Sequence, residues 1–354
     1  MPRLALAAAL AALAAGCARS DAVRVAEPIA PARDWVSPLH RDHPLVGRIW
    51  DVARARFVEE PALDQALAGA PFVLLGEVHD NPDHHLLQAR LLRSLLSSGR
   101  RPAVAFEMLS VEQQSTIDAA RAEPGLTAQR LGQALGWDQS GWPPFRLYQP
   151  IFETALGAQL VVLGANLPRA RIREVVKEGE KALPPGVRDR IARQGPLSPQ
   201  ARAALRKEMA DSHCGELPDA LLDPMILGQR ARDAQMAEVL LRAGPQGAVL
   251  VAGAEHARTD RGAPAYLAPD AGDRRAVAVA FREVDPGELE PLAYARDEES
   301  GGVLPWDYVI FTPAAQRPDP CEGLREHHRA QQAAQPAPPP AAPASPPPTP
   351  PATP

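Results

Sequence analysis

The chain has 354 residues, of which 45% are apolar, and its 38 basic and 43 acidic side chains leave a net charge of −5. This balance, with no basic cluster, argues against a nucleic-acid-binding protein, which needs a concentrated Lys and Arg surface. After the first 20 residues, no apolar stretch approaches the ~18 residues that span a bilayer. Length alone allows roughly two domains. The 40 prolines reduce the part of the chain that can fold, since eleven of them fall between Pro336 and Pro354.

The N-terminus is typical of an export signal. Arg3 supplies a positive charge, residues 4–15 form an apolar run, and small residues lead to Cys17. The run is too short for a membrane-spanning helix, and its end resembles a bacterial lipobox, in which the Cys is lipidated and becomes the mature N-terminus. We therefore predict a signal peptide over residues 1–16 and a lipid on Cys17, with the protein anchored at the outer membrane and facing the periplasm. The alternative is a secreted protein whose signal peptide is cleaved after the A-x-A pattern of ordinary secretory signals.

Export of the protein would place its remaining cysteines in an oxidising compartment. With Cys17 used for lipid, Cys214 and Cys321 form a pair, and exported compartments are oxidising. We predict a disulfide between them. The alternative is that Cys214, which follows His213 directly, is a metal ligand or a nucleophile.

The rest of the chain divides into a tether, a body and a tail. Residues 17–44 hold many prolines and charges without periodicity and are predicted to be a tether, and the Pro-rich residues 316–354 are predicted to be a disordered tail. The body over residues 45–315 contains short, nearly continuous apolar runs, which is the character of strands buried on both faces. We expect strands at residues 71–75, 103–106, 160–163, 248–251, 276–281 and 308–311.

Helical patterns alternate with these strands. Asn81 is a good N-cap for one helix, Gly99 ends that helix, and Ser110 begins a capping box for the next. Alternation of strands and helices implies parallel strands joined by right-handed crossovers. We predict one α/β domain with a mostly parallel central sheet and helices on both faces. The helical stretch 169–245, between the third and fourth strands, is long enough to form an inserted subdomain or lid.

Polar residues directly follow four of the predicted strands. Ligands of open α/β sheets bind outside the carboxyl ends of the strands, so these residues are expected to converge on one site. They are Glu77 and His79 (in G-E-V-H), Glu107, Asn166 (in G-A-N), and His256 and Arg258 (in G-A-E-H-A-R). Two histidines with two or three carboxylates suit a divalent ion such as Zn²⁺ or Mn²⁺.

Four candidate supporting residues can also be explained without a functional role. A turn would explain Asn166, a structural contact would explain His213, and a solvated helix face would explain Arg232 and Asp233. For Glu107 the alternative is a cap of the following helix. His84 and His85 are expected on the solvent side of their helix, outside the site.

A set of motifs, in the right order over about residues 70–270, resembles the ChaN-like haem-binding lipoproteins. The segments that carry the resemblance are L-L-G-E-V-H-D-N-P-D-H-H (74–85), A-F-E-M (105–108), W-P-P-F-R-L-Y-Q-P-I-F-E (142–153), A-N-L-P-R (165–169), H-C-G-E-L-P (213–218), Q-R-A-R-D-A-Q-M-A (229–237) and G-A-E-H-A-R-T-D-R-G-A-P-A-Y-L (253–267). The resemblance implies an α/β fold, an outer-membrane lipoprotein, haem binding and a role in iron uptake. In some relatives a Tyr stands where this chain has Arg261. The wider superfamily includes the Tiki and TraB proteins, described as metal-dependent proteases, and is similar to erythromycin-esterase-type hydrolases.

Two functions therefore compete for one site. A haem-binding protein would hold the iron through a His or Tyr, and Tyr148 and Tyr266 lie within the resembling segments. A metal-dependent hydrolase, protease or esterase, would bind its ion through His79, His256 and a carboxylate, with Glu77 or Glu107 as general base. We favour haem as the cofactor and haem or iron uptake as the role. The protein is expected to contact the membrane through its N-terminal lipid. The oligomeric state is left open between monomer and homodimer.

Overall fold

The computed structural model of the protein describes residues 27–30, 34–295, 302–319, 321–323 and 329. The predicted signal peptide, Cys17, part of the predicted tether and most of the predicted tail lie outside these residues. Within the described residues, no helix combines the length and the apolar character needed to cross a membrane.

The strands form one eight-stranded sheet in the order β2-β1-β8-β7-β3-β6-β4-β5. The six strands from β8 to β5 in this order are parallel, and β1 pairs antiparallel with both β2 and β8. The strand bounds are β1 Ile49–Asp51, β2 Arg56–Val58, β3 Phe72–Glu77, β4 Ala103–Ser110, β5 Val162–Asn166, β6 Ala248–Gly253, β7 Ala276–Glu283 and β8 Tyr308–Thr312.

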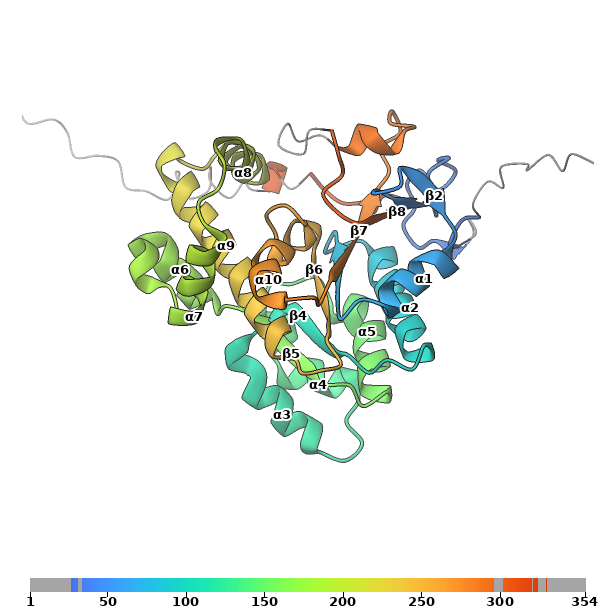
Figure 1. Cartoon of the computed structure of the whole chain (residues 1–354), viewed down its shortest axis with the longest axis horizontal. Coiled ribbons are helices and arrows are strands. Elements are labelled where there is room, and N and C mark those ends of the chain that lie inside the picture. The colour runs from blue at the N-terminus through green and yellow to red at the C-terminus, as the bar shows by residue number, and fades with distance from the viewer. Residues whose placement is uncertain (1–26, 31–33, 296–301, 320, 324–328, 330–354) are drawn as a thin grey trace, which may run out of the picture.

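Helices cover both faces of this sheet. In Figure 1, α9 and α10 lie on one side of the strands, and α1, α2 and α5 lie on the other. The helix bounds are α1 Glu60–Ala68, α2 Pro82–Ser97, α3 Gln114–Ala122, α4 Ala128–Ala134, α5 Phe145–Gly157, α6 Arg169–Glu178, α7 Pro185–Gln194, α8 Pro199–Ser212, α9 Asp219–Arg242 and α10 Ala263–Ala271, with the short 3₁₀ helix η5 at Ala254–Ala257. The predicted α/β architecture is confirmed.

The core strands form where the sequence is continuously apolar. All six residues of β3 and of β6 are buried, because helices pack on both faces of a parallel sheet. The six predicted strands are all present, and the structure extends most of them toward their carboxyl ends. The hairpin of β1 and β2 was not predicted, since three-residue strands carry too few residues for a pattern to be read.

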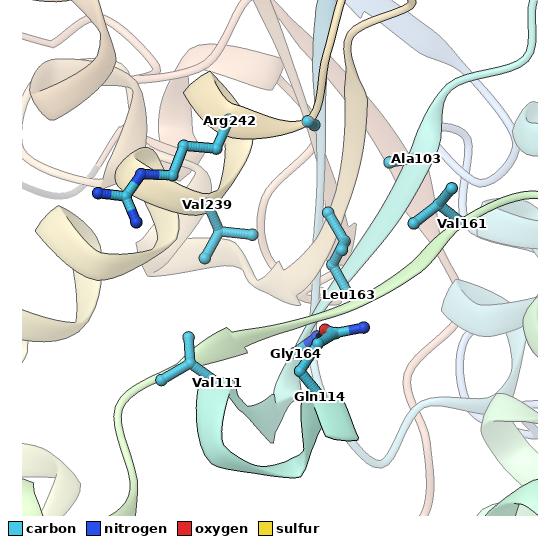
Figure 2. Close-up of a pocket in the computed structure, with 9 residues that line it drawn as sticks. Ala103, Val111, Gln114, Val161, Leu163, Gly164, Val239 and Arg242 are labelled. Atoms are coloured by element: carbon cyan, nitrogen blue, oxygen red, sulfur yellow. Dashed lines mark hydrogen bonds between the residues drawn. The ribbon is translucent and has the colours of Figure 1, made fainter. Parts of the chain in front are cut away.

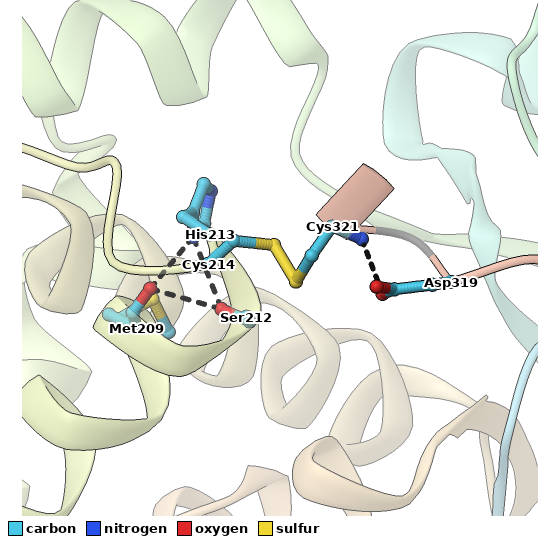
Figure 3. The surroundings of a disulfide bond; sticks show 6 residues. All are labelled: Met209, Ser212, His213, Cys214, Asp319 and Cys321. Atoms are coloured by element: carbon cyan, nitrogen blue, oxygen red, sulfur yellow. Dashed lines mark hydrogen bonds between the residues drawn. A yellow bond between two sulfur atoms is a disulfide. The ribbon is translucent and has the colours of Figure 1, made fainter. Parts of the chain in front are cut away.

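The segment between β5 and β6 is helical throughout, as predicted, and comprises α6 to α9. α8 and α9 form a hairpin whose turn carries Cys214. This cysteine is disulfide-bonded to Cys321, as predicted, with the two Cα atoms 5.5 Å apart (Figure 3). The inserted helices are thereby linked covalently to the segment that follows β8.

The segment before β1 packs against the body, although the sequence places it in the tether. Trp35 and Ser37 are buried, and the Asp83 carboxylate accepts hydrogen bonds from the backbone N–H groups of Val36 and Ser37, both at 2.8 Å. The folded unit therefore begins earlier than the composition of the sequence indicates.

β5 is an edge strand whose outer side is covered by a side chain. The Gln114 amide donates to the Val162 carbonyl at 3.1 Å and accepts from the Gly164 N–H at 3.1 Å. Figure 2 shows Gln114 beside Gly164, in an apolar cavity of about 300 Å³ that also includes Val161 and Leu163. The outward backbone groups of β5 at Val162 and Gly164 thus have partners within the chain.

Candidate functional site

The carboxyl ends of β3, β4, β5 and β6 place their polar residues together. The parallel register aligns Glu77 with Gly253 and Asn166 with Ser110. The Gly253 N–H donates to the Glu107 Oε2 at 2.7 Å, and the Asn166 amide donates to the Glu107 carbonyl at 3.0 Å. Segments that are far apart in the sequence therefore meet around Glu107.

Glu77 is buried at the end of β3 between two histidines and a tyrosine. Its Oε1 lies 3.0 Å from His79 Nδ1 and accepts from the Tyr148 hydroxyl at 2.9 Å, while its Oε2 lies 3.1 Å from His85 Nδ1. Burial favours the neutral carboxyl, but the charge of His85 and the hydrogen bonds from both histidines lower the pKa of Glu77 to about 2. Glu77 is thus an ionised carboxylate that fixes its neighbours.

His85 is held by acceptors at both ring nitrogens. Its Nε2 lies 3.0 Å from the His79 carbonyl oxygen and its Nδ1 faces Glu77. Burial opposes the charged form, but Glu77 raises the pKa of His85. The Glu77 carboxylate therefore favours the imidazolium form of His85 beneath His79.

Glu107 is the centre of the second half of the site. Its Oε1 accepts from the Arg232 guanidinium and lies 3.4 Å from His256 Nε2, and its Oε2 lies 3.9 Å from His79 Nε2. Burial favours the neutral carboxyl of Glu107, but the charges of His256 and Arg232 hold its pKa well below the usual range.

His256 and Asp233 form a buried pair on the far side of Glu107. The His256 Nδ1 lies 2.6 Å from the Asp233 Oδ1. Burial lowers and the two carboxylates raise the pKa of His256, with a net rise to about 9. Burial raises the pKa of Asp233, although His256 acts against this rise. Both ring nitrogens of His256 face carboxylate oxygens, as in an imidazolium.

Two glycines in the G-x-x-H segments make this close approach feasible. A Cβ on Gly76 would come within 2.8 Å of the Ala254 Cα, so β3 can pack against η5 only without a side chain there. A Cβ on Gly253 would lie 3.0 Å from His79 Nε2 and 3.5 Å from Glu107 Oε2. The glycine thus leaves open the space that His79 and Glu107 share.

A cavity of about 300 Å³ opens beside these residues. Glu107, Asn166 and Trp142 contribute to its lining, together with Met108, Leu135, Leu167 and Pro168. His79 does not line the cavity but lies next to two residues that do: its ring is 5.0 Å from the Trp142 ring, edge to face, and its Nε2 is 3.9 Å from Glu107 Oε2. The His79 side chain is 34% exposed, whereas the Glu77, Glu107 and His256 side chains are buried. His79 is thus the most exposed imidazole of this cluster.

Several predicted site residues do not line the cavity. Tyr148 and Tyr266 are fully buried, and their hydroxyls are engaged by Glu77 and Arg230, which does not favour direct ligation of haem iron. Arg258 is buried and pairs with Asp260. His213 lies at the end of α8, with its Nδ1 2.8 Å from the Met209 carbonyl, and Cys214 is in the disulfide, so neither joins this cluster.

The solvent-side placement of His84 and His85 was wrong. Both are fully buried. His84 Nδ1 accepts from the Val78 N–H at 2.8 Å and its Nε2 lies 2.9 Å from the Thr312 hydroxyl, and burial lowers its pKa to about 3, so it is a neutral structural residue. α2 is covered by α5 as well as by β3, so a helix with polar residues in its first turn still buries them. Trp142, also missed, lies in a loop without periodicity.

The predicted divalent ion is not supported by the donor arrangement. In the part of the chain that the structure describes, no group of three or more His, Cys, Asp or Glu side chains is placed to hold a metal ion. The Glu77 and Glu107 oxygens instead face cations and N–H donors, and Arg232 occupies a position that would repel a bound cation.

The fold and site define an α/β protein with a buried network of carboxylates and histidines at the carboxyl ends of its parallel strands. The chain belongs to the family described as haem-binding uptake, Tiki superfamily, ChaN, whose model matches residues 63–267. No match was found among curated protein sequences.

A solved structure shares the fold. ChaN of Campylobacter jejuni, described as binding haem cofacially, is 24% identical over 74% of this chain and 95% of that chain, with a TM-score of 0.58. Lower similarity is found to an erythromycin esterase in its open conformation (14% identity, 74% and 95% coverage, TM-score 0.39) and to the type III effector HopBA1 (14%, 71% and 91%, 0.35).

Proposed function

We propose that the chain binds haem at the carboxyl ends of β3, β4 and β6, with His79 as the ligand of the haem iron. The observation that carries this proposal is the hydrogen bonding and the exposure of the His79 side chain. Its Nδ1 is bonded to Glu77, while its Nε2 has no hydrogen-bond partner among the described residues and the side chain is partly exposed. A histidine whose Nδ1–H donates to a carboxylate presents the Nε2 lone pair to a metal.

The cavity near His79 offers apolar and aromatic contacts to a flat ligand. Met108, Leu135 and Leu167 provide an apolar lining, and the Trp142 indole stands next to the imidazole. Membership of a haem-binding uptake family supports the same ligand. Haem iron, when bound, supplies an open coordination position that an imidazole nitrogen can fill.

The residues around His79 fix its orientation. Glu77 holds the Nδ1–H tautomer, and His85 and Tyr148 in turn hold Glu77. The three buried acidic residues Glu77, Glu107 and Asp233 face three basic ones, His85, Arg232 and His256. Burial opposes the charged form of His79 itself, but Glu107 and Glu77 raise its pKa, so a ligand at its Nε2 competes with a proton.

We further propose that the protein is an exported lipoprotein attached through Cys17 and active in haem or iron uptake at the outer membrane. The signal-peptide pattern before Cys17 supports this proposal. The disulfide between Cys214 and Cys321 also supports it, since disulfides persist in oxidising compartments.

Titration with haemin, followed by the Soret band, tests the haem proposal. We expect His79→Gly to weaken binding more than tenfold, and millimolar imidazole to restore the wild-type spectrum by supplying the missing ligand. His213→Ala is the matched control, because His213 lies outside the cluster, and should bind as wild type. Equal affinities of wild type and His79→Gly, or no effect of imidazole, would remove His79 as the iron ligand.

A hydrolase without a metal is a second candidate, favoured by one observation. The Asp233 carboxylate lies 2.6 Å from His256 Nδ1, which is within hydrogen-bond reach for proton transfer, and Glu107 lies 3.4 Å from His256 Nε2. Turnover of p-nitrophenyl esters by wild type, lost in His256→Gln, would support it. Turnover that is absent, or unaffected by the substitution, would contradict it.

A further inference from the structure

The lining of the cavity near His79 carries a positive charge that no acidic group balances within the described residues. Two charged residues line this cavity, Glu107 and Arg169. Glu107 is matched by Arg232 and by the Gly253 N–H. Arg169 is exposed and makes no hydrogen bond or ion pair within the described residues.

The chain places this guanidinium at the cavity by two local features. Arg169 is the first residue of α6 and follows β5 after the short turn at Leu167 and Pro168. Both of its terminal nitrogens lie 3.3 Å from the point that a Cβ on Gly141 would occupy, so the absence of a side chain there makes room for it. Trp142, the next residue along that loop, lines the same cavity.

The cavity lining thus has two chemically different parts. Met108, Leu135 and Trp142 belong to its apolar side chains, and among its polar side chains Arg169 carries the positive charge without a partner in the described residues. A guanidinium matches a carboxylate in geometry and charge through two parallel N–H bonds. A ligand that satisfies both parts is an amphiphilic acid with a flat apolar body and a carboxylate at its edge.

We propose that Arg169 binds a carboxylate of the ligand and makes the cavity selective for acidic porphyrins over their neutral esters. This inference rests on the proposed haem binding and deepens it, because it names the group on the ligand that the protein recognises. The iron-side contact of His79 and the carboxylate contact of Arg169 then act on different parts of one molecule.

A ligand-and-protein double-mutant cycle tests this assignment. Wild type and Arg169→Gln are each titrated with haemin and with haemin dimethyl ester. We expect wild type to bind the diacid at least tenfold more tightly than the diester, and Arg169→Gln to lose most of this difference by weakening the diacid alone. Arg171→Gln is the control, since Arg171 lies on the same helix but is paired with Glu174 at 2.6 Å, and should keep the full difference.

The outcomes separate this inference from the proposed function. If haemin binding depends on His79 but wild type binds acid and ester equally, or Arg169→Gln weakens both alike, the role of Arg169 is overturned while haem binding stands. If wild type binds neither porphyrin, the proposed function fails and the role of Arg169 fails with it. Raising the salt concentration should weaken the diacid in wild type more than in Arg169→Gln, as a charge-based contact requires.

Discussion

Gly253 shows how the absence of one side chain shapes the site. A Cβ there would lie 3.0 Å from His79 Nε2, which is closer than nearly all observed Cβ contacts. The atoms nearest to this Cβ belong to the tips of side chains, which can shift. We expect Gly253→Ala to displace the imidazole and weaken haemin binding about tenfold, at a cost of roughly 1 kcal/mol in stability. Haemin titration and urea denaturation measure the two effects.

Gly157→Ala is the matched control, because nothing lies within 4 Å of the Cβ it would add. It should bind haemin as wild type does. Wild-type binding by Gly253→Ala would mean that the space between His79 and Glu107 is not used by a ligand.

His256 makes the stability of the protein depend on pH. Its pKa is about 9 in the folded state against an ordinary value of 6.5, because Glu107 and Asp233 favour the imidazolium despite burial. A raised folded pKa contributes stability that is complete below pH 6.5 and is lost as the pH rises through about 9. The free energy of unfolding should therefore fall over this range, and His256→Gln should flatten the fall.

Urea denaturation at intervals between pH 6 and 9.5 measures this dependence. His213→Gln, which leaves the buried cluster intact, should keep the wild-type slope. Parallel curves for wild type and His256→Gln would show that another group produces the pH dependence.

The sequence predicted the convergence of Glu77, Glu107 and His256 because each follows a buried strand, and parallel register brings such positions together. It could not predict the role of His85. That role depends on α5 covering α2, which is a tertiary contact that no local pattern contains. For the same reason the burial of Tyr148 under Glu77 could not be read from its position in a motif.

At the scale of elements, the turn between α8 and α9 is fixed by a covalent bond rather than by packing alone. The disulfide of Cys214 and Cys321 closes a loop of 107 residues. In the chain-entropy model a loop of this length contributes up to about 4–5 kcal/mol to stability. We expect the Cys214→Ser/Cys321→Ser double variant to unfold at a clearly lower temperature than wild type under oxidising conditions.

Reduction of the wild type with a phosphine provides the comparison. Its unfolding temperature should fall to that of the double variant, which itself should not respond to the reductant. An unchanged unfolding temperature after complete reduction, verified by thiol titration, would contradict a stabilising role.

The predicted elements were most accurate where a single physical requirement dominates. Continuous burial selected the apolar strands β3, β4 and β6, and the Asn81 side chain caps α2 as its sequence indicates. The start of the folded unit was misplaced because residues near Trp35 are held by hydrogen bonds to Asp83, which lies 46 to 47 residues further along the chain.

At the scale of the whole molecule, the proposed attachment through Cys17 would decide where the site operates. The charged start, the apolar run and the small residues before Cys17 motivate the proposal. Cys17→Ala should move the protein from the membrane fraction to the soluble periplasmic fraction, and intact-mass measurement should show the loss of the lipid. An unchanged fractionation and an unmodified wild-type mass would refute it.

The Gln114 side chain has a consequence for how molecules of this protein behave at high concentration. An exposed edge strand is a template on which another chain can add its own strand. At the β5 edge, the Val162 carbonyl and the Gly164 N–H are already bonded to Gln114, and the opposite edge strand, β2, is three residues long. The sheet therefore resists growth by self-addition at its β5 edge, which favours a monodisperse protein at high concentration.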